Sequence, residues 1–192
     1  GLNITNTAGN LTGQQVVIEL DMGSAYTAGR IQDDCDDVRV TYYNSSLGQE
    51  QEISHFIDTC NLSQDDNITL FAKVPLIENA TDTFVYVYYG DPDASGASNG
   101  SATFDFFDDF SGTSLDTNKW DTSTAGTYDV TGSMLRMWDS WGSCCTFGCV
   151  YDGLKTKASF TSPIAVHVKH RWGADNSMAS CNMDLNVIYN DL

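Results

Sequence analysis

The sequence predicts an all-β protein built from two jelly-roll-like β-sandwich domains in series, the second of them incomplete. Two observations lead to this prediction. Apolar residues recur with a period of two in almost every segment, and Gly, Asn, Asp and Ser separate the segments. Hydrophobic residues also make up 41% of the 192 residues, which is enough for packed cores. Only 24–31 has the pattern of a short helical turn.

The expected strands are spread over the whole chain. They are 14–21, 36–43, 51–58, 67–75 and 82–90 in the first half, and 128–139, 148–160, 163–172 and 181–189 in the second. The three prolines fall at strand ends or turns, as a sheet requires. Within 82–90 both alternating sets of side chains are apolar or aromatic, so we expect both faces of this strand to be covered.

The stretch FDFFDDF at 104–110 interleaves four Phe with three Asp. We interpret it as the crossover from the first domain, 1–103, into the first strand of the second domain, 104–192. Strand alternation divides it into Phe104, Phe106, Asp108 and Phe110 on one side and Asp105, Phe107 and Asp109 on the other. The phenylalanines would then close two cores.

Clustered carboxylates at such a junction are unfavourable unless they are paired or bound to a cation. Asp108 and Asp109 are therefore candidate calcium ligands, with Asp184 or Asp191 as cross-strand partners. A solvated acidic turn is the alternative. A second acidic run at 32–37 lacks the Gly and the terminal Glu of an EF-hand loop, so it is a weaker candidate.

The net charge restricts the partners. Nine basic and 26 acidic residues give a formal charge of −17, which excludes ordinary nucleic-acid binding and disfavours anionic membrane surfaces. No apolar run approaches the roughly 18–20 residues of a membrane span, so none is expected in this segment. The chain opens on Gly rather than Met, so we expect it to be processed or cut.

Acceptor sites for N-linked glycans are concentrated in the first half. Seven Asn-x-Ser/Thr patterns occur, where chance predicts about 2.5. They lie at Asn3, Asn10, Asn44, Asn61, Asn67, Asn79 and Asn99. None of the five Asn in 104–192 qualifies. Chance occurrence in a Thr- and Asn-rich protein is the alternative, but we expect an exported glycoprotein whose second half stays bare for a partner.

The cysteines agree with export, because an even number in an oxidising exterior favours disulfides. The six are Cys35, Cys60, Cys144, Cys145, Cys149 and Cys181. The four in the second half could instead hold zinc, although adjacent cysteines differ from the usual Cys-x2-Cys pair. We expect disulfides, with Cys181 joined to Cys144 or Cys145, or a bridge to another chain.

Several motifs of the first half occur in a characteristic order: DDCDDVRVTYYN at 33–44, then Cys60, KVPLI at 73–77 and YYGDPD at 88–93. Over 1–103 they resemble a prokaryotic surface-protein domain of unknown function, the 2341 family. The resemblance implies a disulfide between Cys35 and Cys60 and implies no catalysis. Members usually carry one more strand before the position of Gly1, so we expect the chain to begin just after it.

The following stretch, with FFDDFSG at 106–112 and KHRW at 169–172, resembles the opening of a concanavalin A-like (laminin-G-like) jelly roll. Such domains commonly follow the first family in secreted or surface-anchored proteins, and calcium often lies near the equivalent of Asp108. A complete jelly roll needs well over about 100 residues. We therefore expect either a piece of a longer protein or a sandwich completed by a strand from another copy.

Enzymatic activity is not expected. GASNG at 96–100 matches Gly-x-Ser-x-Gly, but it lies in a polar loop, no helix is predicted after it, and Asn99 is a glycan acceptor. His167 and His170 would point to opposite faces of a strand, so they form no metal pair. Glucanases of the concanavalin-like fold use paired acids that include Glu, and 104–192 contains no Glu.

Two functions remain. The first is an extracellular structural glycoprotein that forms a surface filament, sheath or fibre from copies of itself, with a face of His167, Lys169 and Arg171 against the acidic first domain of a neighbour. The second is an adhesin module of a longer surface protein, which binds carbohydrate through Trp138 and Trp141 with or without calcium. Core packing of these two Trp is the alternative.

Overall fold

The computed structural model describes residues 1–192 except 65, 124–125, 139–152, 162–164 and 170–192. The chain divides into two compact units, Gly1–Asp108 and Asp109–Leu192, called unit 1 and unit 2 below. The predicted all-β class is confirmed, because strands hold 40% and helices 6% of the described residues. All strand pairs in the described part are antiparallel.

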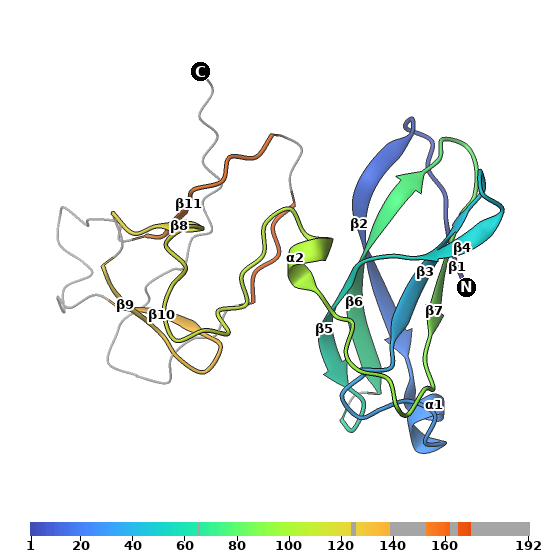
Figure 1. The fold of residues 1–192 in the computed structure, drawn as a ribbon, viewed down its shortest axis with the longest axis horizontal. Coiled ribbons are helices and arrows are strands. Elements are labelled where there is room, and N and C mark those ends of the chain that lie inside the picture. Colours follow the sequence, from blue (N-terminus) through green and yellow to red (C-terminus); the bar gives the residue numbers. More distant parts are fainter. Residues whose placement is uncertain (65, 124–125, 139–152, 162–164, 170–192) are drawn as a thin grey trace. The chain divides into compact units, whose positions relative to one another are not determined.

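Unit 1 is a sandwich of two antiparallel sheets (Figure 1). Sheet A has the strand order β1-β7-β3-β4, formed by Leu2–Ile4, Thr83–Tyr88, Arg39–Asn44 and Gln49–Glu52. Sheet B has the order β2-β6-β5, formed by Leu11–Asp21, Asn67–Ile77 and His55–Asn61. The core lies between the sheets, where Val40 and Val85 of sheet A and Leu70 and Val74 of sheet B have no exposed surface. The short helix α1 (Gly23–Thr27) follows β2, and the short helix α2 (Gly100–Thr103) directly precedes the FDFFDDF stretch.

Most strands predicted for the first half are present, but the single strand expected over 51–58 is wrong. The segment forms two strands, because β4 pairs with β3 in sheet A whereas β5 pairs with β6 in sheet B. The chain crosses between the sheets at Ile53, which is buried and whose N–H donates to the carbonyl of Val40 at 2.9 Å. Alternation continues through this crossover, so the sequence pattern alone does not reveal it.

The expectation that both faces of 82–90 are covered is also wrong. On one face of β7, Thr83 and Val85 are buried in the core. On the other, Phe84 and Tyr88 keep 38% and 48% of their surface exposed. The outer face of sheet A therefore presents aromatic rings to solvent.

The FDFFDDF stretch forms no strand, and the predicted alternation of its side chains is wrong. Phe104 and Phe107 lie on the same side, stacked with ring centroids 5.9 Å apart. Phe56 of β5 contacts both rings, at 5.8 and 4.8 Å, and Phe71 of β6 contacts Phe104 at 5.0 Å. The stretch thus covers the outer face of sheet B with a second apolar layer.

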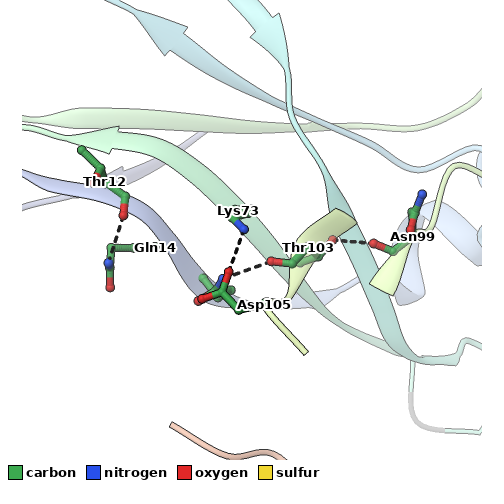
Figure 2. A network of polar contacts seen from close by, with 7 residues as sticks. Thr12, Gln14, Lys73, Asn99, Thr103 and Asp105 are labelled. Carbon is green, nitrogen blue, oxygen red and sulfur yellow. Dashed lines mark hydrogen bonds and ion pairs between the residues drawn. The ribbon is translucent and has the colours of Figure 1, made fainter. Parts of the chain in front are cut away.

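Polar contacts hold this layer in place (Figure 2). The carboxylate of Asp105 pairs with the Lys73 ammonium of β6 at 3.0 Å, and Gln15 of β2 donates to the carbonyl of Thr103 at 3.1 Å. Asn99 caps α2 by accepting from the Ala102 N–H at 3.0 Å. Part of the interleaving of Phe and Asp is thereby explained, since the rings of Phe104 and Phe107 pack on sheet B while Asp105 faces Lys73 at the surface.

A helical turn does follow GASNG, contrary to the expectation from sequence, because α2 begins at Gly100. A side chain at Gly100 would collide with the ring of Phe107, so glycine here permits the close approach of the aromatic layer. The Ser98 hydroxyl accepts a hydrogen bond from the N–H of Ile57 at 2.9 Å. This serine therefore holds the loop to the edge of β5.

Unit 2 contains, in its described part, strands β8 (Trp120–Asp121), β9 (Thr127–Val130), β10 (Leu135–Trp138) and β11 (Lys155–Thr156). The single strand predicted over 128–139 is wrong. β9 and β10 form a hairpin, whose two-residue turn has positive φ at Gly132 and Ser133. Of 148–160 only β11 is a described strand, and the described residues 165–169 form none. The strand expected over 181–189 lies outside the described residues.

Candidate functional site on unit 1

Sheet A carries an exposed patch, called the aromatic face below, formed by Tyr43, Phe84, Tyr86 and Tyr88. The register places Asn3 of β1 opposite Phe84, and Thr41 of β3 opposite Tyr86. Alternation along β7 directs the rings of Phe84, Tyr86 and Tyr88 outward, while Val85 points into the core. The sequence-based prediction missed this face, because alternation does not tell which side of a strand meets solvent.

The aromatic face has a fixed polar margin along β4. Glu50 accepts hydrogen bonds from the hydroxyls of Thr41 at 2.6 Å and Tyr88 at 2.8 Å. The hydrogen bond to Glu50 is the main cause of the raised pKa of Tyr88. Arg39 lies 3.8 Å from the carboxylate of Glu52. Exposed rings beside oriented polar groups are typical of surfaces that contact a carbohydrate or another protein.

A groove of about 210 Å³ lies where the edge strands β1 and β2 of the two sheets approach each other. Its apolar lining includes Leu2 and Ile4 of β1, Val16 and Ile18 of β2, and Val85 of β7. Among the described strands, β2 is paired only with β6, so its second edge is open along eleven residues. Such an edge is a template for adding a strand.

All seven predicted glycan acceptors lie on the described surface of unit 1. Five of them are exposed, namely Asn3, Asn10, Asn67, Asn79 and Asn99. The other two, Asn44 and Asn61, are half-buried. Asn44 uses its side-chain amide to donate to Gln51 at 2.8 Å. None of the seven is buried, so the structure permits glycans at these positions.

A loop cluster joins the motifs that carry the family resemblance. Asp37 is 3% exposed, and its carboxylate accepts from the N–H groups of Gln32 at 3.1 Å and Gly90 at 2.6 Å. Arg39 donates to the carbonyl of Ser95 at 2.7 Å. These contacts tie the acidic run at 32–37 to the YYGDPD turn, so we interpret the motif as structural.

A disulfide joins Cys35 to Cys60 and anchors the same loop to β5. This is the pairing that the family resemblance implies. Cys35 is fully buried and has a positive φ of 61°, a conformation in which side-chain-bearing residues are uncommon.

His55 of β5 is a buried titratable group that the sequence analysis did not single out. Only 1% of it is exposed, and its Nε2 has no hydrogen-bond partner in the described structure. Burial lowers the pKa of His55 below its ordinary value, and the positive charge of Arg39 acts in the same direction. Glu52 and a backbone hydrogen bond at Ile53 oppose this shift.

This burial predicts a pH-dependent stability. The folded state binds the His55 proton less readily than the unfolded state does. The stability that the neutral His55 contributes is therefore fully present above about pH 6.5 and is lost as the pH falls below that value. The free energy of unfolding falls by at most about 1.4 kcal/mol per pH unit from this cause. Urea unfolding at pH 7.5 and 5.5 measures it. The His55→Leu variant should lose this part of the dependence, and an equal slope in both proteins would contradict the assignment.

Two of the predicted calcium ligands, Asp108 and Asp109, belong to the described residues. Asp108 and Asp109 lie near the end of the FDFFDDF stretch, and Asp109 accepts from the N–H of Ser111 at 3.0 Å. That hydrogen bond is the main cause of the lowered pKa of Asp109. Asp184 and Asp191 lie outside the described residues. Within the described part, no three carboxylate, His or Cys side chains gather as a metal site would need.

The other predicted site residues belong to unit 2. His167 and Lys169 lie in the exposed stretch 165–169. Trp138 ends β10, where it pairs with Thr127. The remaining predictions lie outside the described residues: Trp141, Arg171, Cys144, Cys145, Cys149 and Cys181.

The fold thus places unit 1 among antiparallel β-sandwiches, here with an exposed aromatic face and an open edge along β2. Residues 34–123 match the family described as Domain of unknown function (DUF2341), which supports the first of the two resemblances from Asp34 onward. The match includes the loop cluster and continues to β8. No curated protein and no solved structure matches the chain. In the described part, no helix is long and apolar enough to cross a membrane.

Proposed function

We propose that this protein is a non-enzymatic extracellular structural glycoprotein, the subunit of a cell-surface filament, sheath or fibre. The observation that carries the proposal is the open edge of β2 beside the apolar groove. Val17, at the middle of this edge strand, keeps 56% of its surface exposed. Copies of the protein would assemble through contacts between sandwiches, in which a strand of one copy extends sheet B of the next.

Charge and surface chemistry support the same proposal. The seven acceptor asparagines and the disulfide suit an oxidising exterior. The net charge of −17 keeps free subunits soluble and gives a cationic stretch a complementary surface. His167 and Lys169, with Arg171, are our candidate for that stretch, because 165–169 is exposed.

Unit 2 has a part in this proposal as a concanavalin A-like sandwich that is either completed by another chain or continued in a longer protein. Calcium at Asp108 and Asp109, with Asp184 as a third ligand, would fix the start of this sandwich. N-linked glycans would cover unit 1 and leave unit 2 bare for contact with the next subunit.

Negative-stain electron microscopy of native material, isolated without reductant or chelator, tests the assembly. We expect regular filaments or sheets from the natural sequence. We expect short or no filaments from Val17→Lys, because a charged side chain on an edge strand opposes the addition of a further strand. Since Val17 is largely exposed, this variant should keep the fold, which circular dichroism checks.

Leu47→Lys is the matched control. Leu47 is 58% exposed and lies in the turn between β3 and β4, away from the open edge. It should assemble normally. Equal assembly of both variants would contradict the role of the β2 edge, and dispersed particles from the natural sequence would contradict the filament itself.

The aromatic face favours a second candidate function, a carbohydrate-binding adhesin module of a longer surface protein. Its rings and the fixed carboxylate of Glu50 are suited to stacking on a sugar and binding its hydroxyls. A glycan array separates the two candidates. Specific binding that is lost in Tyr86→Ala, together with dispersed particles in the microscope, would favour the adhesin.

A further inference from the structure

The aromatic face is too exposed to be explained as ordinary surface. Tyr43, Phe84 and Tyr88 keep 40%, 38% and 48% of their surface exposed, and they lie together on one side of a single sheet. Scattered single apolar side chains are common on soluble proteins, whereas contiguous groups usually contact something. The question is which molecule covers them.

One glycan acceptor lies directly against this face. Asn3 is exposed and stands opposite Phe84 in the β1–β7 register, and opposite residues in an antiparallel pair have Cβ atoms about 4.5–5.5 Å apart on the same side of the sheet. The neighbours of Asn3 confirm its direction, because Ile4 packs against the core. The Asn3 side chain therefore leaves the sheet beside Phe84.

A second ring flanks the same position. Gly1, two residues before Asn3 and on the same face, lies so close to Tyr86 that an added Cβ would be 2.7 Å from the ring. The Tyr86 ring thus lies against the start of β1. Both rings belong to β7, with Phe84 directly opposite Asn3 and Tyr86 diagonal to it.

The other acceptors within paired strands lack such neighbours. Asn44 stands opposite Gln49, and Asn61 and Asn67 stand opposite each other. Their glycans would leave the sheet beside polar side chains. The juxtaposition at Asn3 is therefore not a general feature of these acceptors.

We propose that the N-linked glycan on Asn3 lies across the aromatic face and is its permanent cover, an inference that rests on the proposed glycosylation. The first sugar is attached at Nδ2 of Asn3, within reach of Phe84 and Tyr86. A pyranose ring has an apolar face of C–H groups that stacks on aromatic rings, while its hydroxyls remain in water. The glycan thereby shields the outer side of sheet A.

Chemical nitration of tyrosine in the native glycoprotein tests the cover. Thr5→Ala removes the acceptor pattern at Asn3 without changing Asn3 itself. In this variant tetranitromethane should nitrate Tyr86 and Tyr43 several-fold faster than in the natural protein, as measured by peptide mass spectrometry. Tyr89, which is 44% exposed and directly follows β7, is the internal reference and should not change. The thermal midpoint should fall by about 4 °C or more, because burial of the rings is lost.

Two further variants serve as controls. Thr5→Ser preserves the acceptor pattern and should behave as the natural protein does, whereas Thr12→Ala removes the pattern at Asn10 and should leave Tyr86 protected. Equal nitration of Tyr86 with and without the Asn3 glycan would overturn the inference. Peptide mapping separates failure of this inference from failure of the proposed function. If Asn3 is unmodified while other acceptors carry glycans, only the inference about the aromatic face is overturned. If no acceptor carries a glycan, the proposed glycoprotein is overturned as well.

Discussion

Replacing Asp37 by Ala is expected to lower the free energy of unfolding by about 3 kcal/mol, since hydrogen bonds to charged groups contribute about 1.5–3 kcal/mol each and two are lost. The carboxylate is 3% exposed and bonds the N–H groups of Gln32 and Gly90, which belong to segments far apart in the chain. No smaller side chain reaches both. The loss is large beside the roughly 5–15 kcal/mol of a typical domain.

Urea unfolding followed by far-ultraviolet circular dichroism measures this effect. All four Trp lie after residue 108, so Trp fluorescence reports on unit 2 separately. Asp37→Asn keeps the size and one acceptor oxygen and should give an intermediate loss. Asp33→Ala removes the same charge from an exposed position in the same loop and should change stability by less than about 0.5 kcal/mol. Equal effects of Asp33→Ala and Asp37→Ala would contradict the role given to the buried carboxylate.

Removing the disulfide with the double variant Cys35→Ala/Cys60→Ala is expected to destabilise the protein by about 3 kcal/mol. The sequence separation of 25 residues sets this value, because cross-linking restricts the unfolded chain more strongly for longer loops. The bond also anchors the loop that presents Asp37 to Gly90, so we expect faster hydrogen exchange at the Gly90 amide in the variant.

The comparison with reductant isolates the cross-link as the cause. In dithiothreitol the natural protein and the double variant should unfold at nearly the same urea concentration, whereas without reductant they should differ. Because four more cysteines lie in unit 2, reduction of the natural protein alone would not be specific for this bond. A difference that persists in reductant would show that the alanine substitutions, rather than the lost bond, destabilise the core.

The strands of unit 1 could be predicted because alternation is a local property. Strands β2, β6 and β7 appear close to where the period of two places them, since each has one face in the core. The same pattern failed at 51–58 and 128–139, where alternation continues through a crossover and a hairpin. At 51–58 the break depends on the different strand that each half pairs with, whereas at 128–139 the two halves pair with each other across a two-residue turn.

The candidate site was harder to predict for a related reason. Asn3 and Phe84 are separated by most of unit 1, and only the pairing of β1 with β7 brings them together. Likewise, the edge-to-face contact of Phe104 with Phe71 depends on the irregular path after α2, not on strand alternation. The burial of His55 could not be predicted from its neighbours in sequence, because a histidine in a strand is equally compatible with an exposed or a buried position.

By itself, the sequence determined the all-β class, the positions of the Asn-x-Ser/Thr patterns and the motifs around Cys35, because these follow from local periodicity and residue chemistry. Tertiary structure decided which face of β7 meets solvent, that Asp37 holds Gly90, and that β2 has an open edge beside a groove. The physical reason is that exposure, hydrogen-bond partners and strand neighbours arise from pairing between distant segments. Periodicity in sequence describes each strand alone and carries no information about its neighbours.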